Sequence, residues 1–252
     1  MKLFVNKDSI VRKIWGCSDT ILFIFAGASA EFALNKAVDW LYFTGKLPAD
    51  PLGRLFSTVA YARQIVFSNH HDALVAIDKI TAIHKGVEQS RGSQIPDWAY
   101  RDVLFMLIDY SIRAFEVLER KLTGAEKTEV FEVFNRVGNR MRIKGLPTNY
   151  TEWLNMREKG LAENLISSKF TGDLFEQYEK HLGWFRYRIL REAQVLIVPR
   201  RVNKLLSLGG IPFLIPVLQV YKLFKLLQAE AVLKKVILPE GYQRQIAMFD
   251  SN

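Results

Sequence analysis

Apolar residues return at steps of three and four along most of the chain, the spacing that places them on one face of an α-helix. One such run is Val103, Leu104, Leu107, Ile108, Ile112, Phe115 and Leu118, and another is Leu52, Leu55, Phe56, Val59 and Val66. The alternation typical of a half-buried strand is scarce, and the one short β-branched candidate is residues 195–198. The pattern therefore predicts an all-α protein.

Turn and cap residues divide this pattern into separate helices. Thr123 followed by Glu126, and Asn149 followed by Glu152, have the spacing of a capping box and predict helix starts. Prolines fall between the apolar runs, where a helix would end. We expect about nine to eleven helices in one domain over residues 1–252, because no internal repeat, low-complexity tract or linker marks a second domain.

The apolar run near the start of the chain has two interpretations. Basic residues precede residues 21–26 and small residues follow at 28–30, an arrangement that imitates a secretory signal. The basic part is long, however, and polar residues stand between it and the apolar run. We therefore favour a buried first core helix from about Asp19 to Asp39, capped by Ser18 or Asp19.

Residues 205–227 form a second apolar segment, within a C-terminal extension of apolar and basic character at 200–252. Glycines, prolines and lysines interrupt this segment, so it does not predict a clean bilayer-spanning helix. Its apolar side has three candidate partners: a membrane surface with acidic headgroups, the rest of the domain, or a second subunit in a homo-oligomer.

Composition and charge narrow the classes of function. The chain has 252 residues, 49% of them apolar, a net charge of +9 and one cysteine, Cys17. A single thiol excludes an intramolecular disulfide and any zinc or iron–sulfur site built on several cysteines, and it is compatible with the reducing cytoplasm, where we expect the protein. The basic residues are scattered without a nucleic-acid-binding motif, so we expect no nucleic-acid partner.

Four histidines are the candidate metal ligands: His70, His71, His84 and His181. His70 and His71 lie in a turn that precedes a helix, and His181 has no second ligand at a useful spacing. His84 falls on the apolar side of the helix expected from about residue 72 to 89. Because a buried neutral imidazole needs hydrogen-bond partners or a metal, His84 is either a satisfied core histidine or a ligand.

Motif spacing excludes most metal and nucleophile chemistries. The sequence has no His-Glu-x-x-His, no pair of Glu-x-x-His motifs, no Gly-x-Ser-x-Gly and no phosphate-binding loop. A mostly helical chain with one interior histidine can still host haem, which requires one strong axial ligand, an apolar slot and cations for its propionates.

Three segments together resemble a known family. They are residues 24–30 (IFAGASA), 50–58 (DPLGRLFST) and 80–87 (ITAIHKGV), with the pattern over 100–116 and the turn at 145–147 in support. In order and spacing they resemble the DUF2236 family, whose members include latex-clearing rubber oxygenases and the MpaB oxygenase of mycophenolic acid biosynthesis. The similarity runs from about Trp15 to Pro199.

The resemblance implies an all-helical fold around haem b, with His84 as the proximal iron ligand and Arg54 and Thr58 beside the haem. Residues four apart share one helix face, so the guanidinium and the hydroxyl can point together at a propionate or at the oxygen side of the haem. The alternative for this pair is a surface arginine and a threonine bonded to its own backbone. The resemblance further implies a haem b-dependent oxygenase that uses dioxygen on a small apolar, isoprenoid-like substrate.

Two departures from the family pattern keep alternatives open. Family members often have Gln-x-x-His-Pro where this chain reads LNKAV at 34–38, and rubber-cleaving members have a lysine where this chain has Ser57. The second departure removes the ground for polyisoprene as substrate. A haem-free helical interaction protein and a peripheral membrane or lipid-binding module on the same fold remain the alternatives.

Overall fold

The computed structural model describes residues 2–45 and 49–210, and within them it contains ten helices and no strand longer than a single bridge. The helices are α1 (Ile10–Trp15), α2 (Ser18–Phe32), α3 (Val38–Phe43), α5 (Pro51–Phe67), α6 (His70–Arg91), α7 (Asp97–Leu118), α8 (Gly124–Arg140), α9 (Tyr150–Glu163), α10 (Lys169–Ile197) and α11 (Arg200–Leu206). The predicted all-α class is confirmed.

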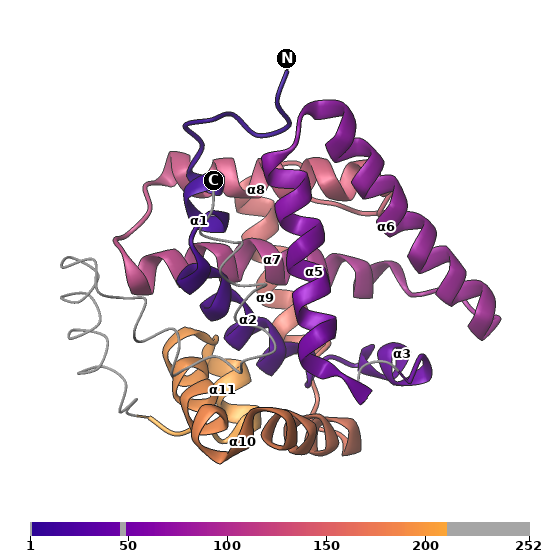
Figure 1. Cartoon of the computed structure of the whole chain (residues 1–252), viewed down its shortest axis with the longest axis vertical. Coiled ribbons are helices and arrows are strands. Elements are labelled where there is room, and N and C mark those ends of the chain that lie inside the picture. Colours follow the sequence, from indigo (N-terminus) through magenta and orange to yellow (C-terminus); the bar gives the residue numbers. More distant parts are fainter. Residues whose placement is uncertain (1, 46–48, 211–252) are drawn as a thin grey trace.

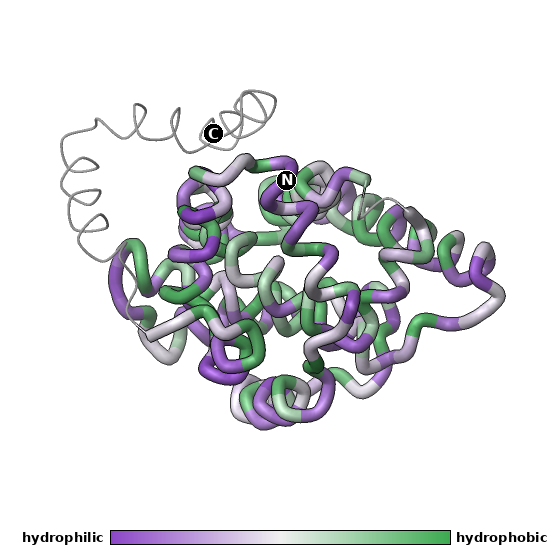
Figure 2. The backbone as a smooth tube through the Cα atoms, turned by 90° about the horizontal axis from the view of Figure 1, so that it is seen from below, coloured by the Kyte–Doolittle hydropathy of each residue, from purple (hydrophilic) through white to green (hydrophobic). Residues whose placement is uncertain are grey.

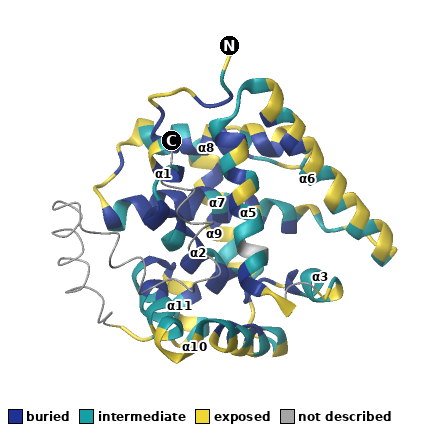
Figure 3. Ribbon diagram, in the orientation of Figure 1, coloured by how far each residue is buried: buried dark blue, intermediate teal, exposed yellow. Residues whose placement is uncertain are grey.

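Helices α2 and α7 form the centre of the fold, and both are dark with buried residues in Figure 3. The other helices are arranged around this pair (Figure 1), and hydrophobic and hydrophilic stretches alternate along the backbone (Figure 2). The two central helices approach closely at Gly27, where an added Cβ would lie 2.2 Å from ring atoms of Tyr110. Apolar burial on both helices therefore explains the core that the helical periodicity predicted.

The predicted start of the first core helix, at about Asp19, is confirmed to within one residue, but its predicted cap and its predicted end are wrong. Helix α2 starts at Ser18 with Cys17 as its N-cap and without a side-chain cap bond, and it ends at Phe32 instead of continuing to Asp39. The chain leaves the helix because Asn35 has partners elsewhere: its Oδ1 accepts from Ala37 N–H at 2.9 Å, and its Nδ2 donates to Asp102 at 2.9 Å.

Both predicted helix starts are confirmed, one with a complete capping box and one with an N-cap alone. Thr123 and Glu126 form a complete capping box at the start of α8. Asn149 caps α9 by accepting from Glu152 N–H, but the Glu152 carboxylate accepts from Thr148 instead of completing a box. The strand candidate at 195–198 is wrong, because α10 continues to Ile197.

Most of the C-terminal extension lies outside the described residues, including positions 211–227 of the apolar segment for which membrane, domain and second-subunit contact were the alternatives. Helix α11 is the part of the extension that the structure describes, and Val202 of α11 is buried against the domain. Within residues 2–45 and 49–210, no helix has both the length and the apolar character needed to cross a membrane.

Candidate functional site

Helices α5 and α6 form an antiparallel pair that contains all three predicted site residues. Asp50 caps α5 by accepting from Gly53 N–H at 2.8 Å, and Asn69 caps α6 by accepting from Asp72 N–H at 3.0 Å. The two helices are joined at the Ser68 turn and diverge toward their other ends (Figure 1). The predicted helix around His84 is thereby confirmed.

Helix α6 is covered by the core only near its start. Its buried residues are Ala73, Ala76 and Ile77, whereas α7, also 22 residues long, has thirteen. None of the α6 residues from Asp78 onward is buried. Thr81, His84, Glu88 and Arg91 follow one another at steps of three and four, and all four are half-buried. We call these four residues the His84 face.

His84 is half-buried rather than fully buried as the sequence indicated, and its Nδ1 atom is enclosed. The edge of its ring meets the ring of Tyr100 at the start of α7, with centroids 5.3 Å apart and planes at 77°. The Tyr100 hydroxyl donates to Glu88 Oε1 at 3.2 Å, and Ile95 N–H donates to the same oxygen at 2.9 Å. Burial, followed by the nearby Glu88 charge, raises the pKa of Tyr100 above its usual range, so the phenol stays protonated.

Thr58 lies on α5 and is half-buried, and Arg54 lies one helical turn before it. The side chain of Arg54 is outside the described residues. Each residue adds about 1.5 Å to the length of a helix. Residue 54 of α5 lies as many residues before the Ser68–Asn69 turn as about residue 83 of α6 lies after it, so the two are equally far from the turn. Arg54 and His84 are therefore at about the same distance from the Ser68–Asn69 connection along their helices. Thr58 lies about one helical turn closer to that connection.

These residues fit a haem group in three respects. The His84 imidazole lies on a helix face that the core leaves partly uncovered, as an axial ligand requires. Trp40, Leu41 and Phe43 of α3 supply half-buried and exposed apolar surface at the far end of α6, where Arg91 contacts Trp40. Arg91 also adds a cation there. Within the described part of the chain, no three His, Cys, Asp or Glu side chains are grouped so that they could hold a bare metal ion.

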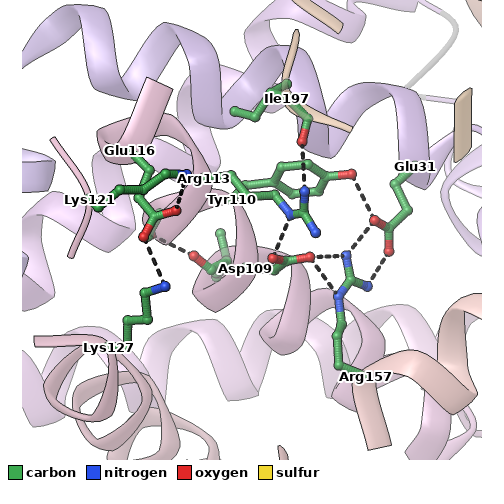
Figure 4. A network of polar contacts seen from close by, with 11 residues as sticks. Glu31, Asp109, Tyr110, Arg113, Glu116, Lys121, Lys127, Arg157 and Ile197 are labelled. Atoms are coloured by element: carbon green, nitrogen blue, oxygen red, sulfur yellow. Dashed lines mark hydrogen bonds and ion pairs between the residues drawn. The ribbon is translucent and has the colours of Figure 1, made fainter. Parts of the chain in front are cut away.

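A buried charge cluster that the sequence did not predict joins α2, α7 and α9 (Figure 4). The guanidinium of Arg157 forms ion pairs with both Glu31 and Asp109, at 3.0 Å for the Asp109 pair. Tyr110 donates to Glu31 at 2.8 Å. Burial opposes the charge of Arg157, but the two carboxylates raise its pKa well above the usual value. The signal in the sequence was a charged residue inside each apolar run, at Glu31 and at Asp109.

The sequence placed His70 and His71 in a turn before the helix, but the structure has both in the first turn of α6. His70 is the first residue of α6, and His71 beside it is exposed. His181 contacts two carbonyl oxygens, those of Gln177 at 2.8 Å and Ala49 at 3.2 Å. These contacts indicate a structural role for His181.

An open groove of 780 Å³ lies elsewhere on the molecule, between residues 2–7 and α8. Its walls carry charges of both signs, among them Lys2, Glu129 and Arg136, and neither Thr58 nor His84 lines it. The groove therefore does not coincide with the predicted site.

The described fold is that of an all-helical catalytic domain. Residues 18–218 match the family model described as ER-bound oxygenase mpaB/B'/Rubber oxygenase, catalytic domain, and the chain belongs to this family. The match begins with α2, contains α5 and α6 in full and confirms the resemblance found in the sequence. The family is one of oxygenase catalytic domains. No curated protein matches the chain.

Proposed function

We propose that the protein is a haem b-dependent oxygenase that uses dioxygen on a small apolar, isoprenoid-like substrate, with His84 as the iron ligand. The observation that carries the proposal is the His84 face, where a long helix in a family of oxygenases presents an imidazole that the core covers only in part. A flat apolar group bound between α5 and α6 would bury the His84 face, and it would provide the apolar contacts that the core does not make with this face.

Each residue has a distinct role in this proposal. His84 holds the iron, and the T-shaped contact with the Tyr100 ring keeps the imidazole from turning. The hydroxyl of Thr58 and the guanidinium of Arg54 are hydrogen-bond donors for the oxygen side, with a propionate as the other acceptor for Arg54. Haem, when bound, supplies the binding and activation of dioxygen. The apolar surface of α3 gives the substrate a place that excludes water.

Cofactor binding is the first test. The protein is purified with haem supplied during expression, and the Soret absorbance per chain is measured for the wild type, His84→Ala and His71→Ala. We expect about one haem per chain in the wild type and in His71→Ala, whose side chain is exposed on the same helix, and loss of the band in His84→Ala. A wild type without stoichiometric haem contradicts the proposal.

Oxygen consumption tests the chemistry itself. The haem-loaded protein is given farnesol or geranylgeraniol in detergent, with a reductant, in an oxygen electrode, and the products are identified by mass. We expect substrate-dependent oxygen uptake and oxygen-containing products, both reduced at least about tenfold in Thr58→Val, which keeps the shape and removes the donor. Uptake without any oxygenated product would contradict an oxygenase.

A second role, peripheral membrane contact, is supported by the bend in α10. Gly183 adopts φ 73° and ψ 160° there, and the next two residues, Trp184 and Phe185, are 70% and 53% exposed. Residues 180–191 contain four Lys or Arg residues and no Asp or Glu. Exposed aromatic side chains among cations suit an interface with anionic lipid headgroups.

Vesicle flotation tests this second role. We expect the protein to float with phosphatidylserine-containing vesicles and to remain at the bottom with pure phosphatidylcholine. The double change Trp184→Ser and Phe185→Ser should abolish flotation, whereas Ile166→Ser, at an equally exposed apolar residue away from the bend, should not. Equal flotation of both variants would refute a role for the bend.

A further inference from the structure

Arg91 ends helix α6 and stands seven residues after His84 on the His84 face. Seven residues are almost two turns of α-helix, so the two residues are displaced by about 10 Å along one face. A ligand that reaches the His84 imidazole and extends along this face toward α3 therefore comes to the Arg91 guanidinium.

The guanidinium of Arg91 is held on one side by α3. Its Nη2 donates to Asp39 Oδ2 at 2.7 Å, and its central carbon lies 4.0 Å from the centre of the Trp40 ring. The centre of the Phe43 ring lies 5.4 Å from the same carbon. An ion pair and a cation–π contact together fix the plane of the guanidinium, so its orientation is set before any ligand arrives.

The other arm of the same guanidinium has no acceptor. Arg91 Nη1 is buried, and no hydrogen-bond partner for it exists among the described residues. A buried charged donor without an acceptor costs free energy, which a ligand that supplies the acceptor recovers. The pair to Asp39 uses one terminal nitrogen, which leaves the second available for another carboxylate.

The same chain shows that one guanidinium can take two carboxylates. Arg157 pairs with Glu31 and with Asp109 at once in the core. At Arg91 the first acid is Asp39, and the described residues supply no second one to Nη1.

We propose that Arg91 Nη1 binds a carboxylate of a ligand that lies along the His84 face. The assignment rests on the proposed function. Two sources offer this chemistry, a haem propionate and the carboxylate of an acidic isoprenoid substrate, and Arg91 serves as the anchor that sets the direction of the ligand along α6.

Titration of the purified apoprotein with hemin and with hemin dimethyl ester tests the propionate source, with the Soret shift as the readout. We expect the wild type to bind the ester about tenfold or more weakly than hemin, because the ester removes the acceptor charge. Arg91→Gln should bind both with the weaker affinity. Arg188→Gln, at an exposed arginine on α10, should match the wild type. The ester comparison on the wild type needs no substitution and so survives a folding defect.

Titration of the haem-loaded protein with farnesoic acid and with farnesol tests the substrate source, by the change in the haem spectrum. If the carboxylate comes from the substrate, the wild type prefers the acid about tenfold and Arg91→Gln loses that preference. If the wild type discriminates in neither titration, or if Arg91→Gln discriminates as the wild type does, the assignment to Arg91 is wrong while haem binding stands. If the wild type shows no Soret shift that depends on His84, the proposed function falls and the assignment falls with it.

Discussion

Arg157 and Glu31 form an ion pair in the core, where their side chains are 6% and 1% exposed. The pair joins α9 to α2 across 126 residues of sequence, and Asp109 of α7 completes the cluster on the other side of the guanidinium. The cluster fixes three helices of the core relative to one another, including the helix whose first turn carries Tyr100.

Removal of the central cation should strongly destabilise the fold. Arg157→Met leaves Glu31 and Asp109 buried without a counter-charge, and we expect the free energy of unfolding to fall by about 3–5 kcal/mol in urea titrations at pH 7. The control is Arg140→Met, which breaks a half-exposed pair with Asp78 and should cost much less, because water screens exposed charges. Equal losses of unfolding free energy in the two variants would show that the buried cluster contributes no more to stability than an exposed ion pair does.

The close approach of α2 and α7 predicts a steric effect at Gly27. A Cβ there would overlap the Tyr110 ring, which is buried and whose hydroxyl is bonded to Glu31. Gly27→Ala should therefore lower the free energy of unfolding by about 1–3 kcal/mol. Gly86→Ala, in an exposed part of α6 with no atom within 4 Å of the new Cβ, should instead raise it by about 0.5–1 kcal/mol. A neutral Gly27→Ala would mean that the helices are farther apart than described.

The capping box of α8 should contribute stability that depends on pH. The Arg120 guanidinium and the Thr123 backbone N–H lower the pKa of Glu126 to about 2, below its unfolded value of 4.5. A carboxyl with a lowered folded pKa stabilises the fold above its unfolded pKa, and the contribution is lost as pH falls from about 4.5 toward 2.

Glu126→Gln should therefore be less stable than the wild type at pH 7, by about 1 kcal/mol because water screens these exposed charges. Urea titrations from pH 7 to pH 2 should show the difference shrinking as the wild-type carboxyl is protonated. A difference that stays constant over this range would contradict the assigned role of the ion pair.

The ring of Tyr100 should act on His84 through its position and not through its hydroxyl. Tyr100→Phe removes the bond to Glu88 and keeps the edge contact, so haem affinity should stay within about twofold while the unfolding free energy falls by about 1 kcal/mol. Tyr100→Ala removes the ring and should weaken haem binding several-fold, read by Soret titration. If Phe and Ala variants bind haem alike, the ring does not position the imidazole.

Local pattern was sufficient to predict the helices whose limits are set locally. The runs on α5 and α7 and the Thr123–Glu126 cap follow from spacing within a few residues, and the structure contains all of them. The end of α2 could not be predicted in this way, because Asn35 leaves the helix to bond Asp102, 67 residues away.

The candidate site, too, could be predicted from local sequence patterns only in part. Periodicity correctly placed His84 on the inward face of α6, but whether a neighbour covers that face depends on how α5 and α6 diverge, which spacing does not encode. The Glu31–Arg157 pair was missed because two charges far apart in sequence give no pattern that links them. The family resemblance, carried by short motifs in order, was predicted and is confirmed.

Chemical rescue of His84→Gly tests the central claim most directly. The variant removes the imidazole and leaves a space for a free one, so hemin titrations are run with and without imidazole in the buffer. We expect the wild type to bind one hemin per chain, the variant to bind little, and imidazole to restore the wild-type Soret spectrum in the variant. Equal hemin binding by the wild type and by the variant without imidazole would contradict the claim.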